Sequence, residues 1–90
     1  MIAYQKLKGC RIGVIMGGAS RERDISLASG GAIYAALKKA GYDVVGIDVT
    51  TSPRAAIKKA HIDVAFNALH GAMGEDGKIE SVLEAMNIAY

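Results

Sequence analysis

The 90-residue sequence is poor in the features that mark secreted and membrane proteins. Cys10 is its one cysteine, which excludes an internal disulfide and favours a reducing compartment, so we expect a cytoplasmic protein. No segment approaches the roughly 18 consecutive apolar residues that a membrane-spanning helix needs. Residues 1–8 (MIAYQKLK) lack the apolar region of a signal peptide. We therefore expect a soluble chain with no membrane partner.

The sequence also lacks a large excess of charge of either sign. Eleven Lys and Arg residues against nine Asp and Glu residues give a net charge of +2, and the bases are scattered from Lys6 to Lys78. Because a nucleic-acid-binding surface needs a clustered basic patch, we expect no nucleic-acid partner. A chain of this length can bury one core, covering roughly 60 to 65% of the unfolded surface. Residues 1–90 are therefore expected to form a single domain.

Apolar segments alternate with helical patterns along the chain. Arg11–Met16 (RIGVIM) is too short for a helix and apolar enough for a strand buried on both faces, as in a parallel sheet. The other expected strands are 42–49, 63–69 and 88–90, and the expected helices are 26–40, 53–60 and a segment with Ile79, Val82, Leu83 and Met86 on one face. This order predicts an α/β fold. It is an open parallel sheet of about four strands, in the order 2-1-3-4, with helices on both faces.

Glycine, serine and proline residues mark the expected helix boundaries. Gly41 follows two lysines, as a glycine just past a helix end does. Ser52 and Pro53 are expected at the N-cap and the first position of the second helix. Gly30 and Gly31 each cost up to about 1 kcal/mol inside the first helix, relative to alanine. We expect close packing at these glycines to compensate.

Two glycine-rich turns follow strands that the predicted order makes neighbours. Gly17 and Gly18 follow the first strand, where the missing Cβ permits positive φ and close approach of a ligand or a strand. His70 and the loop 71–77 follow the third strand. The connections after these strands leave on opposite faces of the sheet, and open α/β sheets bind ligands at such a switch point. We therefore predict a crevice between residues 17–22 and 70–77.

Glu22 and His70 are the candidate functional side chains of this crevice. A carboxylate at its mouth is placed to bind a cationic group, such as the ammonium of an amino acid. The alternative is that Glu22 complements a helix dipole, contributing about 0.3 to 1 kcal/mol, with Arg21 and Arg23 as solvated neighbours. His70 has the alternative of a partly buried histidine bonded to nearby backbone. Its place at the carboxyl end of a strand favours a functional role.

The motifs of nucleotide and metal sites are incomplete in this sequence. Residues 17–22 contain neither G-x-G-x-x-G nor the Gly-Lys-Ser/Thr of a phosphate-binding loop. Asp48, at the end of the second strand, resembles the ribose-binding acid of a dinucleotide fold and keeps a nicotinamide-binding alternative open. No Cys/His cluster has the spacing of a metal site, so no structural metal is expected. Glu75 and Asp76 are expected to cap the last helix.

Two segments together resemble a known family. Residues 17–27 (GGASRERDISL) resemble the GG-x-S-x-E-x-x-[IV]-S-L signature of D-alanine-D-alanine ligases, and residues 68–77 (ALHGAMGEDG) resemble their A-L-H-G-x-x-G-E-D-G segment. The resemblance covers Arg11 to Tyr90 and implies the Rossmann-like N-terminal domain of an ATP-grasp enzyme. In such an enzyme the carboxylate of one D-alanine is phosphorylated by ATP. The amine of a second D-alanine then attacks the acyl phosphate, which gives D-alanyl-D-alanine for peptidoglycan synthesis.

The resemblance also implies roles for particular residues. Glu22 would be catalytic, holding the ammonium of the first D-alanine and orienting a hydroxyl network, while His70 would lie by that substrate's carboxylate and acyl phosphate. The other substrate-binding residues that it implies are Gly17, Gly18, Ser20 and Ile25. ATP and Mg²⁺ would bind the ATP-grasp domains of the same chain, so residues 1–90 are expected to hold no cofactor and to be inactive alone. A homodimer is a further implication.

The chain is accordingly interpreted as the N-terminal, substrate-binding α/β domain of a longer ligase. The alternative is a stand-alone Rossmann-like module that binds a nucleotide or a small anion without catalysis. The sequence beyond Tyr90 would discriminate between these two, because a downstream ATP-grasp region favours the ligase. A natural stop codon after Tyr90 would favour the module.

Overall fold

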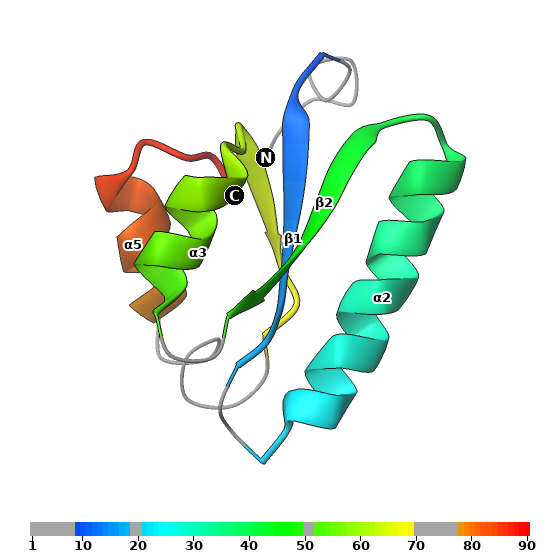
Figure 1. Cartoon of the computed structure of the whole chain (residues 1–90), viewed down its shortest axis with the longest axis horizontal. Coiled ribbons are helices and arrows are strands. Elements are labelled where there is room, and N and C mark those ends of the chain that lie inside the picture. The colour runs from blue at the N-terminus through cyan, green and yellow to red at the C-terminus, as the bar shows by residue number, and fades with distance from the viewer. Residues whose placement is uncertain (1–8, 19–20, 50–51, 70–77) are drawn as a thin grey trace.

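The computed structural model describes residues 9–18, 21–49, 52–69 and 78–90. Three strands alternate with three helices along these residues (Figure 1). The strands are β1 (Arg11–Gly17), β2 (Asp43–Val49) and β3 (Val64–Asn67). The helices are α2 (Arg23–Lys39), α3 (Pro53–Ala60) and α5 (Lys78–Ala85). This alternation confirms the predicted α/β class.

The strands form one parallel sheet in the order β2-β1-β3, as predicted. In register, Ile12 of β1 lies beside Val44 of β2 and Val64 of β3. The predicted fourth strand is reduced to an isolated parallel bridge between Val64 and Ala89, where the Ala65 N–H donates to the Ala89 carbonyl oxygen at 2.8 Å. Because the other side of β3 pairs with β1, this bridge occupies the fourth position of the order 2-1-3-4.

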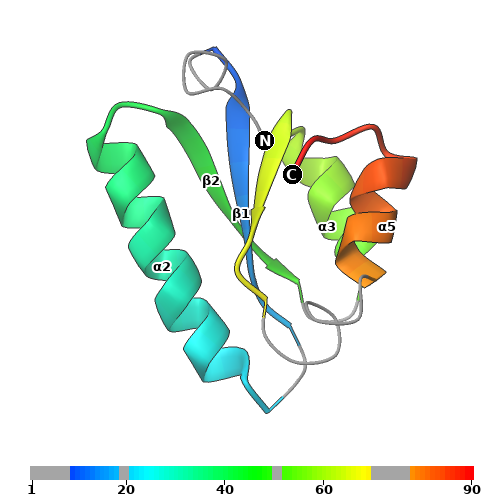
Figure 2. The ribbon, with the colours of Figure 1, turned by 180° about the vertical axis from the view of Figure 1, so that it is seen from behind.

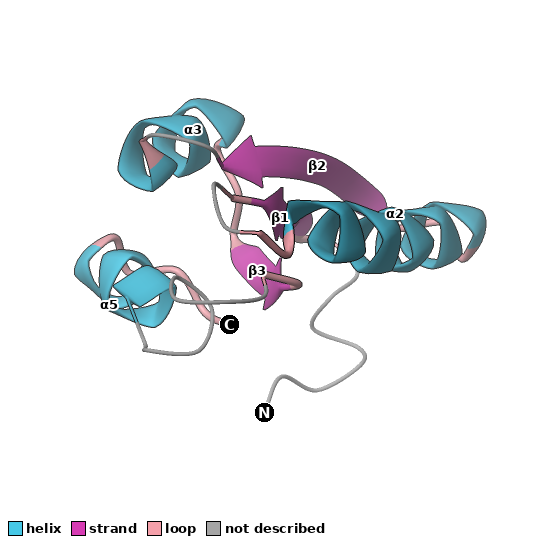
Figure 3. Ribbon diagram, turned by 90° about the horizontal axis from the view of Figure 1, so that it is seen from below, coloured by secondary structure: helices cyan, strands magenta, loops and turns pink. Residues whose placement is uncertain are grey.

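Helices cover both faces of the sheet, as predicted. Figure 3 shows α2 on one side, and α3 and α5 on the other. The side chains of β1 alternate between the two layers, since Ile12 and Val14 belong to the core on the α2 side and Ile15 to the core on the α3 and α5 side. All three are 0% exposed, which confirms that this apolar run is a strand buried on both faces.

The boundaries of α2 and β3 differ from the sequence prediction by two or more residues at one end. Helix α2 begins at Arg23 rather than Ser26, because the Ser26 N–H already donates to the Glu22 carbonyl oxygen at 2.9 Å. Strand β3 is shorter than the predicted 63–69. The Asn67 side-chain oxygen accepts a bond from the Leu69 N–H at 3.0 Å, and this local turn leads the chain out of the ladder.

The ends of the helices follow the sequence signals. Gly41 has a φ of 91° just past α2, as its predicted place after the helix end requires. Ser52 and Pro53 occupy the N-cap and the first position of α3, although the Ser52 side chain makes no capping hydrogen bond. His61 and Asn87 follow α3 and α5 in the left-handed region, with φ of 53° and 59°. The predicted caps Glu75 and Asp76 lie outside the described residues.

The prediction of close packing holds for one of the two glycines inside α2. A Cβ on Gly30 would lie 2.5 Å from the Cβ of Met16, so only glycine lets α2 approach β1 this closely. A Cβ on Gly31 would have no neighbour within 4 Å. The prediction is therefore wrong for Gly31, because that residue faces away from the sheet and is exposed.

Candidate functional site

The carboxyl ends of β1 and β3 lie side by side at the edge where α2 begins (Figures 1 and 2). Ile15 pairs with Asn67, and the Ala68 N–H donates to the Ile15 carbonyl oxygen at 2.8 Å. The chain leaves β1 for α2 on one face, whereas α5, which follows β3, lies on the other face. The topology therefore has the predicted switch point at this edge. His70 and the loop 71–77, predicted as one side of the crevice, lie outside the described residues.

Ser26 joins the two strand ends at this point. Its hydroxyl group is 0% exposed, accepts a bond from the Gly17 N–H at 2.9 Å and donates to the Ala68 carbonyl oxygen at 2.6 Å. One side chain of α2 thus satisfies backbone groups from both β1 and the segment after β3. Ser26 was not among the predicted site residues. Its sequence signal is a small polar residue one turn into a helix that must pack on the sheet.

Arg23 forms an ion pair with Asp48. Its two terminal nitrogens donate to the two carboxylate oxygens of Asp48, at 2.7 and 2.5 Å, and one of them also donates to the Gly18 carbonyl oxygen at 3.1 Å. The interpretation of Arg23 as a solvated neighbour of Glu22 is therefore wrong. Both oxygens of Asp48 are engaged by Arg23, which removes the basis for reading it as a ribose-binding acid.

The ion pair shifts the pKa values of both partners. The hydrogen bonds from Arg23 lower the pKa of Asp48, and the bond to Asp48 raises the pKa of Arg23. Opposite charges on the first turn of α2 and at the end of β2 are the sequence signal for this pair. Finding it required the strand order, which brings the carboxyl ends of β1 and β2 together.

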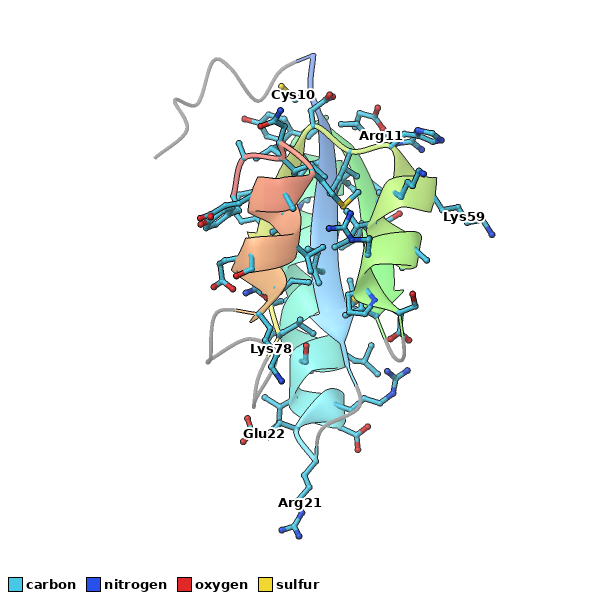
Figure 4. All side chains as sticks on the ribbon, turned by 90° about the vertical axis from the view of Figure 1, so that its left-hand side faces the viewer. Cys10, Arg11, Arg21, Glu22, Lys59 and Lys78 are labelled. Carbon is cyan, nitrogen blue, oxygen red and sulfur yellow. The ribbon has the colours of Figure 1, made fainter. Side chains whose placement is uncertain are left out.

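Glu22 is the N-cap residue of α2, directly before Arg23. Its backbone is fixed by the bond from the Ser26 N–H, and its half-buried side chain makes no capping hydrogen bond to the helix. Figure 4 shows Glu22 and Arg21 at the end of the molecule where α2 begins, and Lys78 of α5 at the same end. The carboxylate thus lies at the end of the molecule that holds the switch point.

Gly17, at the end of β1, and Gly18, after it, both adopt the positive φ that their missing Cβ permits. Gly17 has φ of 86° and Gly18 has φ of 78°. A Cβ on Gly17 would meet the Asp48 carboxylate and lie 2.8 Å from a terminal nitrogen of Arg23. A Cβ on Gly18 would lie 3.3 Å from Leu69.

The remaining predicted site residues are only partly described. Ile25 lies in the first turn of α2 with 56% of its surface exposed, so its side chain is open to a ligand or another part of a protein. Ser20 lies outside the described residues, as His70 does. Substrate contacts by Glu22, His70, Gly17, Gly18, Ser20 and Ile25 stay predictions.

The described residues offer no metal site. Among residues 9–18, 21–49, 52–69 and 78–90, no three His, Cys, Asp or Glu side chains are grouped so that they could hold a metal ion. We therefore assign no step that involves a bound metal to these residues.

Among the described residues, none of the helices combines the length and the apolar character needed to cross a membrane.

Known proteins are similar to nearly the whole chain. The family described as D-ala D-ala ligase N-terminus matches residues 11–56 and 50–90. A D-alanine–D-alanine ligase of Geobacter sulfurreducens is 51% identical over 85 residues, covering 94% of this chain and 27% of that protein. One of Carboxydothermus hydrogenoformans is 54% identical over 80 residues, covering 89% and 26%. A crystal structure of the Bacillus anthracis ligase complexed with ATP has a TM-score of 0.76 and 44% identity, covering 88% and 28%. The chain thus spans little more than a quarter of the length of these relatives.

Proposed function

The chain belongs to the family of D-alanine-D-alanine ligase N-terminal domains, and from this premise we propose that it is the substrate-binding domain of an ATP-dependent ligase that joins two D-alanine molecules. The observation that carries the proposal is the position of Glu22. It lies at the N-cap of α2, at the switch point of a parallel sheet, in a chain about half identical to several ligases. These matches do not favour the stand-alone binding module.

In this proposal Glu22 binds the ammonium of the first D-alanine. A carboxylate accepts hydrogen bonds from an ammonium, and such charge-assisted bonds are about twice as strong as neutral ones. The Glu22 side chain lies at the N-cap of α2 and makes no capping hydrogen bond to the helix. Its backbone carbonyl oxygen accepts the bond from the Ser26 N–H, which ties Glu22 to the first turn of α2. His70 is proposed to lie by the substrate carboxylate, with Gly17, Gly18, Ser20 and Ile25 as further binding residues.

ATP and Mg²⁺ are proposed to bind elsewhere in the whole protein. When bound, ATP supplies the phosphoryl group that activates the carboxylate of the first D-alanine. The relatives are more than three times as long as this chain, and an ATP-grasp region beyond it would hold the nucleotide and the metal. We therefore derive only binding and orientation of D-alanine from the residues of this domain.

The cellular setting is part of the same proposal. The product, D-alanyl-D-alanine, would serve peptidoglycan synthesis in the cell wall, and the ligase would work in the cytoplasm, where ATP is available. A homodimer is proposed from the family resemblance alone.

The test is an assay of the whole protein that contains this domain. With ATP, Mg²⁺ and D-alanine we expect release of ADP and phosphate, and formation of D-alanyl-D-alanine, which mass spectrometry identifies. L-alanine in place of D-alanine is the matched control and should give no dipeptide. ADP release that does not depend on D-alanine, with no dipeptide, would contradict the proposal.

A further inference from the structure

The Arg23 side chain connects three segments at the carboxyl end of the sheet. It starts from the first residue of α2, reaches both carboxylate oxygens of Asp48 near the end of β2, and bonds to the Gly18 carbonyl oxygen after β1. The two parallel bonds to Asp48 use both terminal nitrogens of the planar guanidinium. They therefore fix the orientation of the Arg23 side chain as well as its distance from Asp48. Arg23 therefore anchors the start of α2 to both neighbouring strands.

The missing side chain of Gly17 leaves room for the ion pair. Gly17 lies in the space where Arg23 and Asp48 meet, and a Cβ there would be 2.8 Å from a terminal nitrogen of Arg23. Gly17 itself is held from the other side by the Ser26 hydroxyl group, at 2.9 Å. Gly17 and Gly18 are thus held by hydrogen bonds to Ser26 and to Arg23.

The Arg23–Asp48 ion pair is partly exposed to solvent, so we expect it to add little to the stability of the fold. The side chains of Arg23 and Asp48 are 36% and 45% exposed, and ion pairs at such positions contribute little to stability because solvent screens them. Because Glu22 directly precedes Arg23 in the chain, the ion pair also restrains the position of Glu22. A substitution at Arg23 should therefore change the placement of Glu22 more than it changes the stability of the fold.

We propose that Arg23, held by Asp48, is a positioning residue that fixes the Glu22 carboxylate for binding the ammonium of the substrate. This inference rests on the proposed function of Glu22. Without the bridge, the first turn of α2 is released from β2, and the N-cap residue samples positions in which its carboxylate misses the ammonium. Glu22 binds the ammonium before and during the reaction, so the loss should appear mainly in KM for D-alanine rather than in kcat.

The experiment measures kcat and KM for D-alanine in the whole protein and its variants. For Arg23→Gln we expect KM to rise about tenfold while kcat changes less than about threefold. Arg23→Lys keeps the charge but loses the fork, and should raise KM about threefold. The matched control is Arg21→Gln, which removes the same charge on the other side of Glu22 from an exposed side chain. It should leave KM within about twofold, which separates the bridge from a simple change of charge.

A double-mutant cycle then tests whether Asp48 acts through Arg23. Asp48→Asn should raise KM as Arg23→Gln does, and the double variant should be no worse than either single one, because both remove the same bridge. Additive effects, or an Arg23→Gln enzyme equal to Arg21→Gln, would overturn the proposal. Glu22→Gln in the same assay keeps the two hypotheses apart. If that variant is fully active, the proposed role of Glu22 fails; if it is impaired while Arg23→Gln is normal, only the positioning role fails.

Discussion

Glu22 is the residue on which the proposed chemistry depends most. If its carboxylate binds the substrate ammonium in a crevice that excludes water, Glu22→Gln leaves that ammonium unpaired. We expect kcat/KM of the whole protein to fall by about 30-fold to several-thousand-fold, corresponding to about 2 to 5 kcal/mol, with little change in Tm. Steady-state kinetics at varied D-alanine, beside thermal melts, measure both effects.

The control for this substitution is Asp24→Asn, which removes an exposed carboxylate from the first turn of the same helix. Complementing the dipole of α2 is a role that Asp24 and Glu22 share, and it is worth only about 0.3 to 1 kcal/mol. Asp24→Asn should therefore leave kcat/KM within about twofold. If Glu22→Gln lowers kcat/KM no more than Asp24→Asn does, Glu22 only complements the dipole of α2 and does not bind the substrate.

The ion pair of Asp48 predicts a dependence of stability on acid pH. Hydrogen bonds from Arg23 lower the folded-state pKa of Asp48 below the unfolded value of about 3.9. The stabilisation is therefore complete above that unfolded value and is lost as pH falls through the lower, folded value. Between pH 5 and pH 2 the native chain should lose more Tm than Asp48→Asn does. The difference should shrink in high salt, because the pair is exposed.

Asp43→Asn is the control, since Asp43 is an exposed carboxylate at the opposite end of β2. That variant should keep the acid sensitivity of the native chain. Equal acid slopes in the native chain and Asp48→Asn would show that the pair contributes no pH-dependent stability.

The conformation of a single residue could be predicted from the sequence only where its residue type favours one conformation at that position. Gly41 was predicted just past a helix end, where glycine with positive φ is typical, and the structure confirms this place. For Gly18 the missing Cβ permitted a positive φ, and the structure has one. Arg23 and Asp48 were misread because a charged side chain has many possible partners. Their pairing depends on strand order and on the exact register of β1 with β2, which spacing along the chain does not contain.

At the level of the helix, α2 offers two adjacent glycines with opposite predictions. Gly30→Ala places a methyl group 2.5 Å from the Met16 Cβ, so overpacking should cost about 1 to 3 kcal/mol and outweigh the gain in helix propensity. Gly31→Ala meets nothing within 4 Å and should stabilise the chain by about 0.5 to 1 kcal/mol. Urea unfolding of the two variants measures both values. Equal changes in the two variants would contradict the packing of α2 on β1.

Ser26 ties α2 to two strand ends, and Ser26→Ala should therefore weaken the sheet as well as the helix contact. The substitution takes a partner from the Gly17 N–H and from the Ala68 carbonyl oxygen, both in the interior, at about 1 to 3 kcal/mol for each unsatisfied group. We expect the free energy of unfolding to fall by about 2 to 4 kcal/mol. Ser29→Ala, one turn further along α2, is the control and should be neutral or slightly stabilising. A Ser26→Ala variant as stable as Ser29→Ala would refute this role.

The elements themselves were predictable because their hydrophobic periods differ. The buried run of β1 and the spacing of Ile79 and Leu83 on α5 each fit one kind of element, and the structure buries these side chains completely. The ends of elements were less predictable. β3 ends early because the Asn67 side chain competes for a backbone N–H, and a four-residue strand gives too short a pattern to show where the ladder stops.

At the scale of the whole molecule, we expect the 90-residue chain alone to have no ligase activity. The relatives are more than three times its length, and within the described residues no three His, Cys, Asp or Glu side chains are grouped to hold a metal ion. Incubation with ATP, Mg²⁺ and D-alanine should release no more ADP than incubation without D-alanine. D-alanine-dependent ADP release from the pure 90-residue chain would contradict this prediction, and the whole protein at equal concentration is the positive control.

The sheet order has a consequence for how molecules of this protein meet one another in concentrated solution. Within the described residues β2 pairs only with β1, so its outer edge presents backbone groups on which a strand of a second molecule could dock and start aggregation. Asp43 and Asp48 lie near the two ends of this edge. Gly46 lies between them and has no side chain that could contact a docked strand. Asp43 places an exposed carboxylate on this edge in every copy, which repels an identical edge, whereas the charge of Asp48 is compensated by Arg23. Repulsion between two such edges should therefore come from the Asp43 end of β2 rather than from the end that carries the Arg23–Asp48 pair.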